Sequence, residues 1–199
     1  MKKAYVLIFD GYADWEIGYI LPELRRLGKI DVVTAGFTDK TVVSMGGLHV
    51  IPDTVLSEVN MEDILVFILP GGHMWEVDYP VVETEEFLHR LEKAKIPVAA
   101  ICAATTVLAR AGLVHNRKHT SNSLKYLSKM VPSYTDSAFY VDSLAAGDDH
   151  IITASGLGAI EFTMEIFDEL NLISSDMKKM WYNAIKHGIY PEGIEEKQF

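Results

Sequence analysis

The chain has 199 residues, 49% of them hydrophobic and 23% charged, which predicts one folded domain and excludes disordered and collagen-like classes. Eighteen Lys and Arg against 28 Asp and Glu give a formal net charge of -10, so nucleic acid and anionic membranes are not expected as partners. No apolar run approaches the roughly 20 residues that span a bilayer. The single cysteine cannot form an internal disulfide, so we expect a cytoplasmic protein.

Five short apolar runs predict buried strands. They are "AYVLIF" (4–9), "IDVVTA" (30–35), "ILVFIL" (64–69), "PVAAIC" (97–102) and "HIITAS" (150–155). Runs that are apolar at nearly every position are typical of strands covered on both faces, as in a parallel sheet.

Helical patterns separate these runs. Apolar residues recur at helical spacing over 15–28, 81–95, 103–111 and 158–171, and Gly28 is placed to end the first of these helices. Between the second and third strands, Gly46 and Gly47 lie between two β-rich pieces of segment 41–52, which predicts a hairpin. The alternation of strands and helices predicts a doubly wound α/β sheet with helices on both faces.

The end of the chain reads as one more helix, over 174–190. Its apolar face, Met177, Met180, Trp181 and Ile185, fits either packing on the body of the domain or a subunit interface. We therefore divide the chain into an α/β domain, 1–173, and a helical extension packed on it, 174–199. The last eight residues, 192–199, are expected to fray.

The only cysteine, Cys102, lies where a predicted strand turns at once into a helix. A lone cysteine is often a small buried hydrophobe. A side chain on such a sharp turn projects instead into the ligand crevice, and the helix N-terminus that follows favours a thiolate or an oxyanion. Ala103 and Ala104 let that helix begin close to the neighbouring strands. The turn lacks the glycines of the hydrolase pattern G-x-S-x-G, so the core interpretation stays open.

Two other strand ends carry candidate groups. Gly71 and Gly72 follow the third strand, where they form either a simple turn or a close backbone approach that completes an oxyanion hole. Glu16 follows the first strand and either complements the dipole of the first helix or faces Cys102. Two negative charges about 4 Å apart repel by roughly 4 kcal/mol, so Glu16 either shares a proton with the thiol or stays protonated and donates a hydrogen bond to sulfur or to a substrate oxygen.

At these places together the chain resembles the ThiJ/PfpI (DJ-one) family, a branch of the class I glutamine amidotransferase-like superfamily. The resemblance covers about residues 3–171 through four motifs in order, "YVLIFDGYADWEI", "LPGGHMWE", "AICAATTVLARAGLV" and "IITASGLGAIEFTMEIFDEL". It implies a flavodoxin-like fold and usually a homodimer. It also implies that Cys102 is the nucleophile, Glu16 the acidic residue beside it, and the N–H groups of Gly72 and Ala103 the oxyanion hole.

One position departs from that resemblance. Many relatives place a histidine after the strand that follows the nucleophile helix, whereas "RKHTSNSLKYL" (117–127) has Asn122 there. Asparagine cannot act as a general base. His119, expected on that strand, and His73, beside the glycine pair, are the accessory candidates, although each also fits a hydrogen-bonded structural role.

No cofactor or metal is expected, because the acidic "GDDHI" (147–151) is better explained as a turn before a strand. Three functions follow. The first is an enzyme in which Cys102 attacks a carbonyl or amide of a small molecule and Glu16 shuttles the proton, as a hydrolase, hydratase or glyoxalase-like catalyst. The second is a non-catalytic stress protein with an oxidisable Cys102. The third is an α/β interaction module without chemistry.

Overall fold

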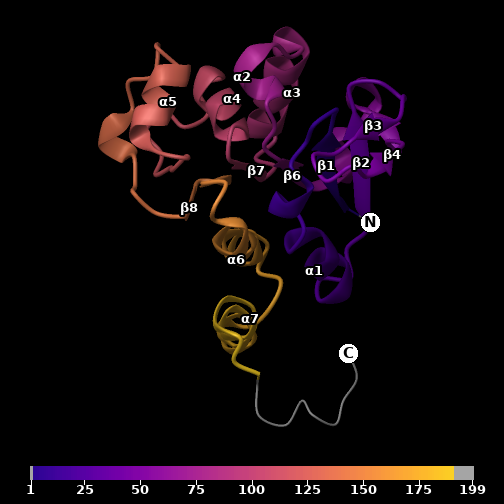
Figure 1. The fold of residues 1–199 in the computed structure, drawn as a ribbon, viewed down its shortest axis with the longest axis vertical. Helices are drawn as coiled ribbons and strands as arrows, with labels where there is room; N and C mark the ends of the chain where they lie inside the picture. The colour runs from indigo at the N-terminus through magenta and orange to yellow at the C-terminus, as the bar shows by residue number, and fades with distance from the viewer. Residues whose placement is uncertain (1, 191–199) are drawn as a thin grey trace.

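The computed structural model describes residues 2–190, which form a seven-stranded sheet in the order β5-β2-β1-β6-β7-β9-β8 (Figure 1). In that order the strands are Thr54–Val55, Val32–Gly36, Lys3–Ile8, Ile64–Leu69, Val98–Ile101, Ile151–Ala154 and Ala145–Asp148. All neighbouring strands are parallel except β8 and β9. This confirms the predicted flavodoxin-like, mainly parallel α/β fold in a single domain.

Helices cover both faces of the sheet. Figure 1 shows α2, α3 and α4 gathered on one side, with α1, α6 and α7 on the other. The helices are α1 (Ile20–Arg26), α2 (Met74–Val77), α3 (Val81–Lys93), α4 (Ala104–Arg110), α5 (Leu124–Met130), α6 (Ala159–Leu170) and α7 (Ser175–His187). Short 3-10 turns are η1 (Asp14–Glu16), η2 (Leu56–Glu58), η3 (Met61–Asp63) and η4 (Ser137–Phe139).

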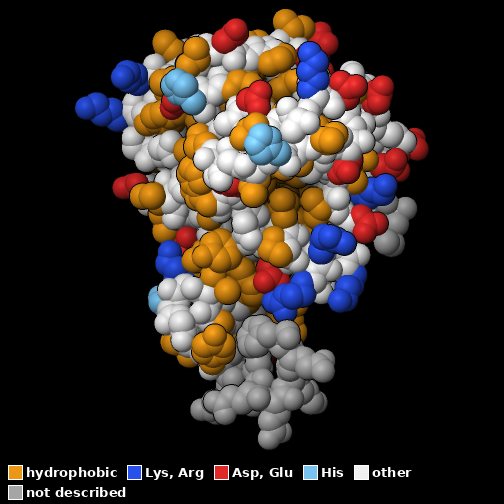
Figure 2. All heavy atoms as spheres, turned by 45° about the vertical axis from the view of Figure 1, so that its right-hand side comes forward, with side chains coloured by type: hydrophobic (Ala, Val, Ile, Leu, Met, Phe, Trp, Pro, Cys, Tyr) orange, Lys and Arg blue, Asp and Glu red, His pale blue; other side chains and the backbone are white. Residues whose placement is uncertain are grey.

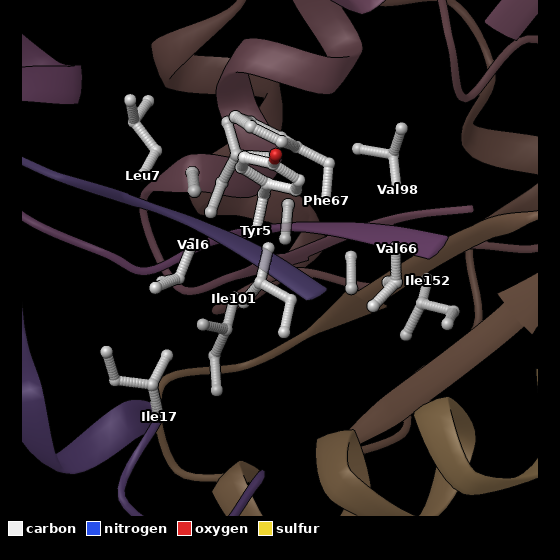
Figure 3. Packing of buried hydrophobic residues seen from close by; sticks show 14 of the residues in the cluster. Tyr5, Val6, Leu7, Ile17, Val66, Phe67, Val98, Ile101 and Ile152 are labelled. Carbon is white, nitrogen blue, oxygen red and sulfur yellow. The ribbon is translucent and has the colours of Figure 1, made fainter. Parts of the chain in front are cut away.

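The core is built on the alternation of side chains along the central strands (Figure 3). Tyr5 pairs with Phe67, which pairs with Val98, and the three lie on one side of the sheet. Val6 and Ile101 point to the other side, where α1 and α6 pack. Residues buried on both faces explain why these strands are apolar at nearly every position.

Five elements differ from the sequence-based expectation. The first helix is split into η1 and α1, so Glu16 lies on a 3-10 turn instead of beginning a long helix. The expected strand around His119 is wrong, because that segment makes only one isolated bridge, to Tyr140, before α5 begins. The short strands β5 and β8 and helix α5 were not expected, since none is long enough to show a clear hydrophobic period.

The predicted hairpin is present as β3 (Val42–Val43) and β4 (His49–Val50), and it packs on the loop after β1. Asp10 Oδ1 accepts a hydrogen bond from Val43 N–H at 2.8 Å, and Asp14 Oδ2 accepts one from Ser44 Oγ at 2.6 Å. The hairpin therefore fixes the loop that ends in η1.

Helix α7 lies against α1 and α6. Trp181 is buried, and its ring lies edge-on to that of Phe167 with the ring centroids 5.3 Å apart. Its Nε1–H donates a hydrogen bond to Glu23 Oε1 at 3.0 Å. Met177, Met180 and Ile185, the rest of the predicted apolar face, stay 36–41% exposed. The division of the chain at residue 173 stays a prediction, and the expected fraying of 192–199 lies outside the described residues.

We expect Trp181→Phe to lower the free energy of unfolding by about 1–2 kcal/mol, because it removes a buried hydrogen bond to a charged group and keeps most of the apolar contact. Urea denaturation measures the change. Tyr182→Phe is the control on the same helix, since it removes a hydrogen bond to Glu161 from a more open position. Equal effects of the two substitutions would contradict the role of Trp181 as the anchor of α7.

Candidate active site

Cys102 lies on a sharp turn between β7 and α4. Its φ is +59°, a left-handed conformation that is uncommon for residues other than glycine and that costs about 1–3 kcal/mol. Its N–H donates to Ala154 O at 2.9 Å, and its carbonyl accepts from Thr105 Oγ1 at 2.6 Å. These bonds hold the side chain at the carboxyl edge of the sheet, so the predicted sharp turn is present.

Four neighbouring strands deliver the groups around the sulfur. Glu16 follows β1, Gly71 follows β6, Cys102 follows β7 and Gly156 follows β9. A Cβ atom on Gly71 would lie 2.6 Å from Glu16 Oε2 and 2.7 Å from Cys102 Cβ, and one on Gly156 would lie 2.9 Å from Cys102 Sγ. Only glycine at these two positions leaves room for the carboxyl and the thiol together.

The side chain of Glu16 is held inside the protein. Only 1% of the residue is exposed, and Oε2 accepts the Gly71 N–H at 2.6 Å. Burial raises the pKa of Glu16, while the hydrogen bonds with Gly71 and the Cys102 thiol oppose this rise. The carboxyl thus lies next to the sulfur instead of serving as a surface complement to a helix dipole.

The same burial acts on the sulfur. It raises the pKa of the Cys102 thiol to about 11, with the charge of Glu16 as the second cause. Hydrogen bonds from Asn122 and from the Ala103 N–H lower the thiol pKa without reversing the rise. The expectation that the start of α4 would favour a thiolate is therefore outweighed by desolvation, and the resting sulfur is a thiol.

Asn122 lies at the sulfur. Its Nδ2 donates to Cys102 Sγ at 3.4 Å, and its Oδ1 accepts the Gly156 N–H at 2.9 Å. Its backbone neighbour Ser121 shares a hydrogen bond with Thr105 at 2.6 Å, which ties this loop to the cysteine turn. Asn122 is exposed, so the site is open to solvent on this side.

Neither accessory histidine hydrogen-bonds Cys102. His119 is fully buried, with Nδ1 2.7 Å from Arg117 O and Nε2 2.6 Å from Tyr134 Oη, so both ring nitrogens have structural partners. His73 has a side chain that is 77% exposed, and its Nδ1 lies 3.1 Å from Glu76 Oε2.

Two main-chain N–H groups are candidates for an oxyanion hole. The Ala103 N–H is directed at the sulfur. The Gly72 N–H donates no hydrogen bond to any described residue, whereas the adjacent Gly71 N–H is taken by Glu16. A Cβ at Gly72 would lie 2.5 Å from the ring of Phe9, which explains the need for glycine there.

Sequence reasoning missed Gly156 and the function of Gly71. Both glycines follow strands that flank β7. A glycine just after each of these strands is the sequence feature that could have predicted the close approach to Cys102. Among residues 2–190, no three His, Cys, Asp or Glu side chains gather as metal ligands, and no helix is long and apolar enough to cross a membrane.

The raised pKa of Glu16 predicts how stability changes with pH. The folded protein holds the Glu16 proton more tightly than the unfolded chain does. The stability that this proton contributes is therefore fully present below pH 4.5, the ordinary pKa of a glutamate, and is lost as pH rises through the pKa of the folded state. Glutamine does not titrate. The melting temperature of Glu16→Gln should therefore rise relative to wild type between about pH 4.5 and pH 8.

Thermal melts of both proteins across this range measure the difference, with Glu62→Gln as an exposed control of equal charge change. A difference that does not change with pH would contradict a raised pKa at Glu16.

The chain is similar to known proteins over most of its length. The sequence profile described as the DJ-1/PfpI family matches residues 2–169. The uncharacterized protease YoaZ of Bacillus subtilis (strain 168) is 33% identical over 194 residues, covering 93% of this chain and 91% of the relative. The glutathione-independent glyoxalase DJR-1.2 of Caenorhabditis elegans is 31% identical over 173 residues, covering 85% of this chain and 89% of the relative.

A solved structure, that of the thiJ/pfpI family protein from Bacillus anthracis, aligns with a TM-score of 0.83 at 36% identity. The alignment covers 94% of this chain and 92% of that one. The match over residues 2–169 includes Cys102 and the residues that surround its sulfur, Glu16, Gly71, Asn122 and Gly156. This chain belongs to the DJ-1/PfpI family.

Proposed function

We propose that the protein is a cysteine-dependent enzyme that acts on a small-molecule carbonyl compound, with Cys102 as nucleophile and Glu16 as proton shuttle. The observation that carries the proposal is the buried contact between thiol and carboxyl, in a space that Gly71 and Gly156 keep open. A thiol with a raised pKa needs a base within reach, and Glu16 is that base.

A dicarbonyl such as methylglyoxal fits the chemistry. The sulfur forms a bond to the aldehyde carbon while the thiol proton passes to Glu16. The carbonyl electron pair moves to oxygen, where the N–H groups of Gly72 and Ala103 stabilise the negative charge. Glu16 then returns its proton to that oxygen, which completes a hemithioacetal.

Glu16 next takes the proton from the former aldehyde carbon and passes it to the former ketone oxygen, which gives an enediol. Glu16 then takes the proton from the other hydroxyl of the enediol and passes it to the adjacent carbon, which gives a thioester. Water breaks the carbon–sulfur bond, a proton returns to Cys102, and a 2-hydroxy acid leaves. One dicarbonyl and one water give one hydroxy acid, so no external oxidant or reductant is needed.

Amide hydrolysis receives less support from this site. A departing amine needs a proton from a strong general acid, which in a Cys–His enzyme is an imidazolium. Here Asn122 occupies the position beside the sulfur, and the two accessory histidines have other partners. The name of the Caenorhabditis elegans relative, a glutathione-independent glyoxalase, agrees with the carbonyl reaction.

Reversible oxidation of Cys102 is the alternative function, and the electrostatics disfavour it. The thiolate is the form that attacks peroxide, and a thiol pKa of about 11 leaves little thiolate at neutral pH. The proposed reaction avoids this limit, because the proton leaves the sulfur only as the carbon–sulfur bond forms.

We expect two opposite effects from Glu16→Gln. Turnover of methylglyoxal should fall by about 100-fold or more, because the proton shuttle is lost. Alkylation of Cys102 by iodoacetamide at about pH 8 should accelerate by about tenfold, because the charge that raises the thiol pKa is gone. Lactate release and the mass of the alkylated protein measure the two rates.

The controls are Cys102→Ser, which should abolish both reactions, and Glu62→Gln, which should change neither. Slower alkylation in Glu16→Gln would contradict the pairing of the two groups. Conversion of Cys102 to a sulfinate by mild peroxide, with no turnover of any dicarbonyl, would replace this proposal with the redox function.

A small-molecule substrate and a homodimer are part of the same proposal, and family membership supports both. On the face that Figure 2 shows, Lys and Arg side chains lie beside acidic and apolar ones, and the absence of a nucleic-acid partner stays a prediction from the net charge of -10. The cytoplasmic location and the absence of a cofactor stay predictions.

A further inference from the structure

A second carboxylate lies near the open side of the site and has no part in the proposed reaction. Glu76, on α2, accepts a hydrogen bond from Tyr126 Oη at 2.6 Å through Oε1, and its Oε2 lies 3.1 Å from His73 Nδ1. Its side chain is 30% exposed. The carboxylate is thus fixed in position and still in contact with solvent.

The chain path joins this carboxylate to the segment that carries Asn122, the exposed residue at the sulfur. One segment leaves the sulfur at Gly71 and reaches Glu76 five residues later. The other leaves the sulfur at Asn122 and reaches Tyr126 four residues later. The bond between Tyr126 and Glu76 therefore joins two segments that both begin at the sulfur, on the side where Asn122 is exposed.

The carboxylate is charged. The hydrogen bond from Tyr126 is the largest cause that lowers the pKa of Glu76. Burial opposes this effect, and the contact with His73 lowers the pKa further. Burial and the adjacent carboxylate raise the pKa of Tyr126, and the sulfur of Cys102 also contributes to this rise. The Tyr126 hydroxyl therefore stays protonated and donates a hydrogen bond to Glu76. It also lies within electrostatic range of the Cys102 sulfur.

Arg110 is the cation near this pair, and its N–H groups are already engaged. It donates to Trp75 O at 3.0 Å and to Met130 O at 3.2 Å, and it makes no ion pair with Glu76. Arg110 therefore does not neutralise the Glu76 carboxylate, which stays 30% exposed.

From this geometry we infer that Glu76, held by Tyr126, is a specificity determinant that selects neutral or cationic electrophiles and disfavours those that carry a carboxylate. The inference rests on the proposed function, because it takes Cys102 as the reacting group. The substrate class that fits is an uncharged dicarbonyl, or an aldehyde that bears an amine or hydroxyl groups. Anionic 2-oxo acids are disfavoured by repulsion from Glu76.

Alkylation of the full-length protein tests this without any need for turnover. Iodoacetamide is neutral and iodoacetate is anionic, and both attach a carbon to the same sulfur by displacing iodide. The fraction of thiolate is common to both reactions, so the ratio of the two rate constants reports the charge at the entrance. The rates are measured at about pH 8.5 and low ionic strength by mass spectrometry.

We expect iodoacetate to react more slowly than iodoacetamide with wild-type protein, and Glu76→Gln to raise the relative rate of iodoacetate by about threefold. The effect should shrink in about 0.5 M salt, where charges are screened within a few ångströms. Glu62→Gln, which removes an exposed charge at the opposite end of β6, should leave the ratio at the wild-type value.

Tyr126→Phe separates charge from structure. It removes the hydrogen bond and keeps the carboxylate, so the ratio should stay close to wild type. An unchanged ratio in Glu76→Gln would overturn the inference while leaving Cys102 as the nucleophile. An equal change in Tyr126→Phe and Glu76→Gln would also overturn it, since the effect would then be structural. A sulfur that reacts with neither reagent would overturn the proposed function itself.

Discussion

The hydrogen bond from Gly71 N–H to Glu16 Oε2 holds a carboxyl inside the protein, next to the only thiol in the chain. A buried carboxyl without donors would be costly, and here the donors are the Gly71 N–H and the thiol of Cys102. The hairpin β3–β4 fixes the loop that brings Glu16 to this place, and glycines 71 and 156 leave the space that it fills.

Desolvation determines the chemistry that this arrangement can perform. It raises the pKa of both Glu16 and Cys102, so the sulfur keeps its proton at rest and is a weak nucleophile until a substrate arrives. In the proposed reaction, transfer of the thiol proton to Glu16 is therefore part of the bond-forming step. In our inference Glu76, which is more exposed than Glu16, leaves the sulfur chemistry unchanged and determines which substrates approach.

Sequence patterns predicted the fold well where segments were long and uniform. The central strands show apolar residues at nearly every position because both of their faces are covered, so their type was readable without contacts. The prediction was wrong around His119, where an isolated bridge replaces a strand, and over residues 15–28, where a 3-10 turn precedes a shorter helix. There the hairpin and the loop contacts outweigh the local pattern, as tertiary contacts commonly do.

The sequence by itself determined that Cys102, Glu16 and the glycine pair follow strands of one parallel sheet, because strand ends in such a sheet meet at a common edge. Only the tertiary structure decided which glycine N–H binds Glu16, that Asn122 reaches the sulfur, and that burial keeps the sulfur protonated. Hydrogen-bond partners and desolvation depend on atoms from segments far apart in the chain, and no local pattern records these distances.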